Sequence, residues 1–220
     1  MIHLIGKSNQ YAERRKEGRL PRGLGKFKYS IPWPIDTETP NLHLSCYFGE
    51  VNYADPLDKT DRHNAIDIQV PYGTPVLSPE KSKVVFLDTY SGPKGLVDML
   101  LWGIDSKIVY LLCHLDGDSV PYKVRKRRYS DRYTRSTVDS EEFIGKVGRW
   151  PKELTKEVKI PQDVERVYGR EYHHLHFQTN YEPNEYGFGF DEEKNGFNPL
   201  LILKNLLNNK QLTGRPILDG

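Results

Sequence analysis

From residue 43 onward, the chain alternates between short apolar segments and clusters of turn-forming residues. Several of the segments have an apolar residue at every second position, and they are LHLSCYFGEV, AIDIQV, TPVLS, SKVVFLDTY, LVDMLLWGI, SKIVYLLCHL, EFIGKVG and HHLHFQTN. PYG, SGPKG, DS and DGDS lie between them, and such clusters are typical of turns that join antiparallel strands. The pattern therefore predicts a mainly β protein with an antiparallel β-sheet core.

The two ends of the chain differ from this central pattern. Residues 1–42 are basic, contain Gly and Pro and show no sustained period, so we expect a basic N-terminal arm. A chain of 220 residues is long enough for one sizeable core. We therefore expect a single domain over residues 43–210, followed by a C-terminal tail over 211–220.

Two stretches inside the domain interrupt the strands, and a third predicts a helix. Residues 121–140 are basic and rich in Tyr and Ser, and residues 151–170 are charged and carry two prolines, so we expect both to be inserted loops. Near the end, NPLLILKNLLNNKQL offers Asn198 as a helix cap and Pro199 at the first helical position. We expect a short C-terminal helix there, packed on the sheet through its leucines.

Composition describes a polar-surfaced protein, with 37% hydrophobic and 28% charged residues. No run of about 18 apolar residues exists, so we expect no membrane span, and no standard secretory signal is visible in the chain. Two cysteines, Cys46 and Cys113, are too few for a disulfide framework. Cys113 lies in an apolar run, which favours a small buried thiol.

A net charge of +2 conceals two basic clusters. The first consists of Arg14, Arg15, Lys16, Arg19, Arg22, Lys26 and Lys28, and the second of Lys123, Arg125, Lys126, Arg127, Arg128, Arg132 and Arg135. Such runs are either solvated loops or surfaces that attract a polyanion, such as nucleic acid or an anionic cell-wall polymer.

Three histidines occur within four positions of the segment EYHHLHFQTN. Side chains of a strand alternate between its faces, so His174 and His176 are expected on one face, with His173 and Leu175 on the other. The pair is either a polar feature of a half-exposed strand or part of a metal site, because neutral imidazole is a common zinc ligand. His173 is expected to be structural or solvent-facing.

Partners for this pair of imidazoles occur earlier in the chain. His63 and Asp67 are separated by three residues at the edge of a predicted strand, and with His176 they would supply two nitrogens and one oxygen. Three such ligands form a catalytic zinc set, since they leave a fourth position for water. His114 ends an apolar strand before a turn, where it is either a satisfied core histidine or a further member of this group.

At this point the order of the motifs resembles a known family. CYFG, HNAIDIQVPYGTPVLSP, YLLCHLDGD, FIGKVG, HHLHFQ and NPLLIL follow one another over residues 44–202 as in the lysostaphin-type, or LytM-like, zinc endopeptidases. The resemblance implies an antiparallel β core of the duplicated hybrid motif type. It also implies one Zn²⁺ per chain and hydrolysis of peptide bonds in bacterial peptidoglycan by a zinc-activated water.

The resemblance also assigns roles to individual residues. Carried over from the family motifs, His63, Asp67 and His176 would bind the zinc, and His114 and His174 would be catalytic histidines that are not ligands. We expect the two catalytic histidines to share activation of water and stabilisation of the developing oxyanion.

The chain departs from the family pattern at several positions. Ala65 stands where the family usually has Gly, His173 stands where it often has Pro or a small residue, and the interval between His114 and His174 is longer. Tyr53 and Tyr110 are additional candidates for a hydrogen bond at the site.

Other functions fit parts of the pattern. A zinc-binding scaffold module of the same fold would need no catalysis, although it would be expected to lose some of these five histidine and aspartate positions. A nucleic-acid-binding β protein would use the basic clusters, but they lack an evident aromatic stacking ladder. A peptidoglycan substrate implies an extracytoplasmic location, in the periplasm or cell wall, and a phage-borne or specially exported enzyme would fit.

Overall fold

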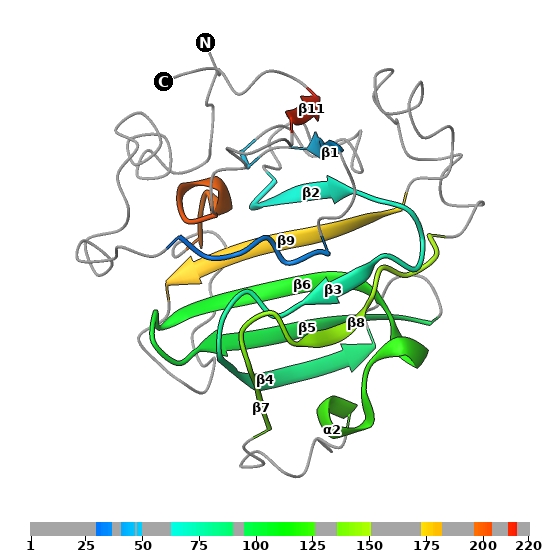
Figure 1. Cartoon of the computed structure of the whole chain (residues 1–220), viewed down its shortest axis with the longest axis vertical. Helices are drawn as coiled ribbons and strands as arrows, with labels where there is room; N and C mark the ends of the chain where they lie inside the picture. Colours follow the sequence, from blue (N-terminus) through cyan, green and yellow to red (C-terminus); the bar gives the residue numbers. More distant parts are fainter. Residues whose placement is uncertain are drawn as a thin grey trace.

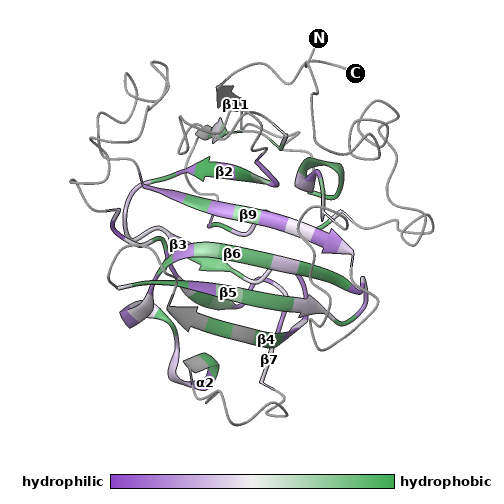
Figure 2. Cartoon of the chain, turned by 180° about the vertical axis from the view of Figure 1, so that it is seen from behind, coloured by the Kyte–Doolittle hydropathy of each residue, from purple (hydrophilic) through white to green (hydrophobic). Residues whose placement is uncertain are grey.

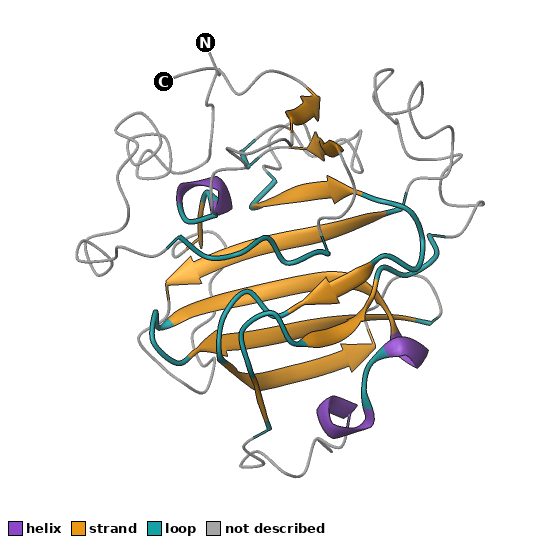
Figure 3. Cartoon of the chain, viewed as in Figure 1, coloured by secondary structure: helices purple, strands orange, loops and turns teal. Residues whose placement is uncertain are grey.

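The computed structural model describes residues 30–36, 41–46, 48–49, 63–89, 95–125, 136–150, 173–181, 196–203 and 211–214. Strands dominate these residues, and helical structure is confined to short turns (Figure 3). The prediction of a mainly β fold is therefore confirmed.

A large sheet organises the described part of the chain. Its strands are β1 (Asn41–Cys46), β2 (Ala65–Gln69), β4 (Ser82–Thr89), β5 (Leu96–Gly103), β6 (Ile108–Asp116), β7 (Thr137–Val138), β9 (His174–Tyr181), β10 (Gly196–Phe197) and β11 (Gln211–Gly214). Their order is β11-β1-β2-β9-β6-β5-β4-β7, with β10 also paired to β9 (Figure 1). All of these pairings are antiparallel except that of β1 with β11.

A small second layer covers one face of this sheet. The strands β3 (Pro75–Leu77) and β8 (Phe143–Lys146) pair with each other and lie in front of β5 and β6 in Figure 1. Apolar side chains from both layers are buried in one cluster, which includes Ile66, Leu112 and Phe177 of the large sheet and Val76 and Ile144 of the small one. The main core therefore lies between the two layers.

Residues near both ends of the described chain are part of this fold. Ile31, Trp33 and Ile35 are buried in the main core, and Ile35 forms a bridge with Val76. The strand β11, which lies in the predicted tail, pairs with β1. The domain boundaries drawn from the sequence stay predictions, because most of the arm and of the tail lies outside the described residues.

The predicted insertions and the predicted helix are described only in part. A short helix α2 (Tyr122–Arg125) and β7 lie within the first insertion, and the second insertion falls outside the described residues. A 3₁₀ turn spans Pro199–Leu201, and the Asn198 side chain accepts a hydrogen bond from the backbone N–H of Leu200, as a cap does (3.1 Å). The helical stripe predicted beyond Leu203 lies outside the described residues.

Two further expectations concern thiols and membrane spans. Cys46 and Cys113 are both buried, and neither takes part in a disulfide. Among the helices that the structure describes, none has the length and apolar character required to cross a membrane.

Tyr110, a candidate for the site, lies on the wrong face of the sheet for that role. Its ring stacks on Phe177 in the main core, and its hydroxyl donates a hydrogen bond to the buried carboxylate of Glu80. The hydroxyl of Ser106 bonds the same carboxylate. The side chains of His174 and His176 lie on the opposite face of the sheet. Tyr110, which lies on the core face, therefore cannot contact them.

We expect Tyr110→Phe to lower the free energy of unfolding by about 1–3 kcal/mol, because it leaves the buried Glu80 carboxylate without one of its donors. Denaturant unfolding measures the change, and metal content should stay as in the wild type. Tyr72→Phe is the control: Tyr72 is 46% exposed, and its loss of a hydroxyl should change stability by no more than about 0.5 kcal/mol. Equal stability of Tyr110→Phe and wild type would contradict this structural role.

Candidate metal centre

The pairing of β2 with β9 brings the predicted ligands together. Asp67 lies directly opposite His176, and Gln69 lies opposite His174. Residues directly opposite in an antiparallel pair share a face, so these four side chains lie on one face of the sheet. Seen from behind in Figure 2, β9 is coloured mainly as hydrophilic next to the more apolar β6. Ile66 and Phe177, which alternate with these residues along the two strands, are buried in the main core, so the four side chains lie on the side of the sheet away from it.

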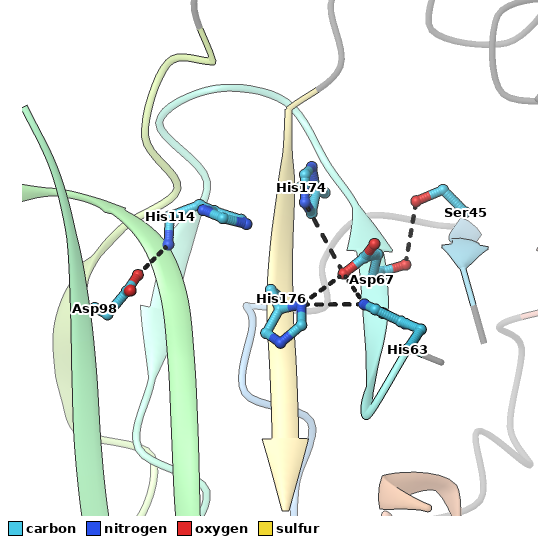
Figure 4. A network of polar contacts seen from close by, with 7 residues as sticks. All are labelled: Ser45, His63, Asp67, Asp98, His114, His174 and His176. Carbon is cyan, nitrogen blue, oxygen red and sulfur yellow. Dashed lines mark hydrogen bonds and ion pairs between the residues drawn. The ribbon is translucent and has the colours of Figure 1, made fainter. Parts of the chain in front are cut away.

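Three ligand atoms form a nearly equilateral triangle at this place (Figure 4). Nε2 of His63 lies 3.1 Å from Oδ1 of Asp67 and 3.1 Å from Nδ1 of His176. Nδ1 of His176 lies 3.1 Å from the same carboxylate oxygen. The side chains of His63 and Asp67 are buried, whereas His176 is partly exposed.

The triangle fits the donor set and spacing of a zinc site. Zinc bonds of about 2.0–2.2 Å to nitrogen and oxygen in a tetrahedral arrangement separate the ligand atoms by roughly 3.4 Å. The observed separations of 3.1 Å are close to this value. Three protein ligands of the His, Asp and His types also leave one position open, as catalytic zinc sites do.

Cys46 is a nearby donor that the sequence did not reveal. Its sulfur lies within 4.8 Å of ligand atoms of His63 and Asp67, because Cys46 of β1 pairs with Asp67 of β2. This proximity alone would suggest a site of Cys46, His63 and Asp67. The triangle that includes His176 is tighter, and its separations are closer to those that zinc bond lengths require.

Local structure fixes the two ligands that come from the start of β2. His63 lies just before the strand, and its carbonyl accepts a hydrogen bond from the backbone N–H of Gly49. The carbonyl of Asp67 accepts a hydrogen bond from the hydroxyl of Ser45 (3.5 Å), which ties β2 to β1 at this point. His63 and Asp67 are four residues apart, and the carboxylate of Asp67 reaches back to the His63 ring.

His174 and His114 lie beside the triangle rather than in it. Nε2 of His174 lies 3.9 Å from Oδ1 of Asp67, beyond hydrogen-bonding distance. The His114 ring makes edge contacts with the rings of His174 and His176, with centroids 4.7 Å and 5.9 Å apart. The structure therefore brings all five predicted site residues into one cluster, with three at the centre and two beside it.

A bulge in β6 turns His114 toward this cluster. Cys113 lies opposite His176, so regular alternation would point His114 to the other face. The register between β5 and β6 shifts so that Cys113 and His114 together face Asp98. His114 has a backbone φ of +68°, in the left-handed region, and its N–H donates to the Asp98 carboxylate (3.2 Å; Figure 4). The bulge re-aims the side chain, as bulges beside active sites do.

Charge and burial set the protonation of two members of the cluster. Burial by itself raises the pKa of Asp67, but the charges of His63 and His174 and hydrogen bonds from His176 and His63 outweigh it, so the pKa lies well below the usual value. Burial lowers the pKa of His114, and the charges of His174 and His176 lower it further. Near neutral pH, Asp67 is thus an ionised carboxylate and His114 a neutral imidazole, which has a nitrogen able to accept a proton.

His173 and Trp150 complete the surroundings of the site. His173 is 7% exposed, so it is not solvent-facing, and its Nδ1 accepts a hydrogen bond from the backbone N–H of Trp150 (3.1 Å). No pattern in the sequence selects Trp150, because its contact with His173 brings together two segments far apart in the chain. Tyr53 and most of the two basic clusters lie outside the described residues.

Comparison with known proteins returns solved structures only. No family model matches the chain, and no curated protein matches it. Csd3 of Helicobacter pylori matches 80% of this chain at 16% identity with a TM-score of 0.46. Lysostaphin of Staphylococcus simulans matches 78% of it at 17% identity with a TM-score of 0.48. A zinc-containing peptidase of Vibrio cholerae matches 68% of it at 18% identity with a TM-score of 0.43.

These matches cover different shares of the known proteins. The aligned region covers 35% of the Csd3 chain, 52% of the lysostaphin chain and 36% of the Vibrio cholerae chain. The chain therefore spans about half or less of the length of each of these known chains.

We expect the protein to bind about one zinc per chain and His63→Ala and His176→Ala to lose most of their affinity for it. Each substitution removes one of three ligand atoms, and the remaining two donors hold zinc far less tightly. Elemental analysis after exhaustive dialysis against a weak chelator measures the difference.

Cys46→Ser is the matched control for this measurement. It alters a neighbouring donor outside the triangle, so zinc content should equal that of the wild type. Full zinc occupancy in both histidine variants, or its loss in Cys46→Ser, would contradict the assigned ligand set.

Proposed function

We propose that this chain is a zinc endopeptidase that hydrolyses peptide bonds in bacterial peptidoglycan, within a cross-link or a stem peptide. The observation that carries the proposal is the triangle of His63, Asp67 and His176 with two further imidazoles beside it. The motif order and the similarity to lysostaphin and other peptidase structures support the same reaction class.

The three residues of the triangle would hold the metal. Zinc at such a site lowers the pKa of a water and polarises a carbonyl. Asp67, held ionised, contributes the negative charge that favours a divalent cation, and the two imidazoles complete the set with nitrogen donors. The pairing of β2 with β9 keeps two of these ligands in place, so little of the geometry has to form on binding.

His114 and His174 would carry the proton transfers and stabilise charge. Amide hydrolysis needs an acceptor for a proton of water, a donor to the leaving amine and a partner for the oxyanion. The two rings are in mutual contact and flank the triangle, so both reach the space next to it. We propose that they share these three tasks through their ring nitrogens.

The bulge at His114 favours catalysis over a scaffold that only binds metal. A left-handed backbone at a residue other than Gly costs about 1–2 kcal/mol. Binding of zinc by the triangle does not require His114, so a purely structural site would gain nothing from this arrangement. Strained residues of this kind gather at functional sites.

A peptidoglycan substrate places the proposed activity outside the cytoplasmic membrane, in the periplasm or the cell wall. The wall and its attached polymers are anionic, and we propose that the basic cluster between residues 123 and 135 attracts them. Exposed Lys and Arg side chains act over a Debye length of about 8–10 Å, so such attraction weakens as salt rises.

We expect the zinc-loaded protein to release peptides from purified sacculi, and His114→Ala and His174→Ala to lose at least about a hundredfold in rate while they retain zinc. Sacculi of two cross-link chemotypes are digested, and mass analysis of the released peptides identifies the bond that is cut. Zinc content of each variant is measured in parallel. A wild type that binds zinc but releases nothing from either chemotype would favour the scaffold module.

We expect neutralisation of Arg125, Lys126, Arg127 and Arg128 together to weaken binding to whole sacculi at low salt, because the attraction to anionic polymers is lost. Co-sedimentation of wild type and variant at low and high salt measures this effect. Turnover of a short soluble peptide is the control and should barely change, since the site is untouched. Equal pelleting of the two proteins at both salt concentrations would mean that these residues are ordinary solvated charges.

A further inference from the structure

One indole contacts both of the histidines that are not ligands. The Trp150 ring meets the His114 ring edge-on, with centroids 4.7 Å apart and an interplanar angle of 86°. The same indole lies tilted against His174, with centroids 5.4 Å apart and an angle of 40°. Together with the direct contact between His114 and His174, these form a closed group of three rings.

The segment that carries Trp150 is fixed to the fold on two sides. Val147 accepts a backbone hydrogen bond from Gly73 and donates one to Thr74, both at 2.9 Å. Gly148 donates to the carbonyl of His114 at 2.8 Å. A Cβ at position 148 would lie only 2.9 Å from that carbonyl oxygen, so the close approach requires glycine. The backbone before Trp150 is therefore attached directly to the bulge at His114.

His173, which lies just before β9, also holds the segment that carries Trp150. Its Nδ1 accepts a hydrogen bond from the backbone N–H of Trp150, and its own carbonyl accepts one from Val70. Since the donor is a main-chain N–H, Nδ1 of this buried imidazole carries no proton. His173 precedes His174 in the chain, so the residue that holds the indole backbone adjoins one of the rings that the indole contacts.

We propose that Trp150 is a positioning residue that fixes the orientations of the His114 and His174 rings, and that His173 holds Trp150 in place. The proposal rests on the proposed function for the catalytic role of the two rings. The terminal torsion of a histidine is broad, so an imidazole without packing on its faces and edges samples many orientations. A displacement of about 1 Å in a reacting group can reduce the rate about a hundredfold.

This arrangement answers why the segment EYHHLHFQTN carries three histidines. His176 belongs to the triangle, and His174 lies beside it. His173 instead holds Trp150, whose indole packs against His174 and His114. The family to which the motifs are similar often has Pro or a small residue at this position, which offers no acceptor to a neighbouring backbone. The contact that holds Trp150 thus uses His173, a position at which this chain departs from that pattern.

The test compares Trp150→Ala with Trp150→Phe, and His173→Ala with His173→Asn, in the full-length zinc-loaded protein. Trp150→Phe retains an aromatic ring beside the two histidines. In His173→Asn the side-chain oxygen lies where Nδ1 of histidine lies, so the variant keeps an acceptor for the backbone N–H of Trp150. Trp102→Phe is the control, because Trp102 contacts Lys83 and Lys107 and belongs to a separate apolar cluster.

The first readout is the NMR signals of the imidazole protons of His114 and His174. We expect Trp150→Ala to remove the ring-current shift of both, and His173→Ala to reduce it. Trp150→Phe, His173→Asn and Trp102→Phe should preserve most of the wild-type pattern. Zinc content and thermal unfolding of every variant are measured in parallel. If an alanine variant fails to fold, Trp150→Phe and His173→Asn still allow the test to be decided.

The second readout is the kinetics of hydrolysis of a soluble peptide. We expect kcat to fall about tenfold to a hundredfold in both alanine variants with KM within about twofold, and the conservative variants to recover most of the rate. A raised KM at unchanged kcat would make Trp150 a substrate contact instead, and unchanged imidazole signals in Trp150→Ala would overturn the proposal. Because the NMR readout needs no turnover, an inactive wild type would refute the proposed function without deciding the positioning role.

Discussion

The alignment of β2 with β9 is the constraint on which the site depends. Asp67 and His176 become neighbours only in the observed register, and a slip of one residue would turn either side chain into the core. The register is held by the opposite face of the same two strands, where Ile66, Ile68 and Phe177 are fully buried. Burial of these apolar side chains therefore holds Asp67 and His176, the proposed ligands on the opposite face, side by side.

A second essential feature of the site is the irregularity in β6 at His114. Regular alternation along β6 would place His114 among core residues, and the bulge opposite Asp98 reverses this. The left-handed backbone is held by hydrogen bonds to the Asp98 carboxylate and from Gly148, which offset its conformational cost. Regular pairing thus brings the ligands together, and a local irregularity adds the neighbouring imidazole.

The alternation of apolar and polar residues within single segments allowed those features to be predicted that depend on one segment alone. Strand positions and the shared face of His174 and His176 follow from alternation within one segment. The motif order predicted which residues gather, but it gave no sign of Cys46 beside Asp67, because that contact depends on the pairing of distant strands. Tyr110 was wrong as a site candidate for the same reason, since its face is decided by the pairing of β6 with β9, which stacks its ring on Phe177 in the core. Of the two alternatives for His173, structural or solvent-facing, the structure supports the first, because its side chain is buried and accepts a hydrogen bond from Trp150, more than twenty residues earlier in the chain.

The triangle itself is an argument for a cation. Nε2 of His63, Nδ1 of His176 and Oδ1 of Asp67 lie 3.1 Å from one another in a largely buried place. A neutral imidazole carries a proton on only one of its two nitrogens, and an ionised carboxylate only accepts hydrogen bonds. Whichever tautomers the two rings adopt, at least one of the three contacts therefore brings together two donors or two acceptors. A single divalent ion satisfies all three donors at once, and metal binding and folding of this part of the sheet would then stabilise each other.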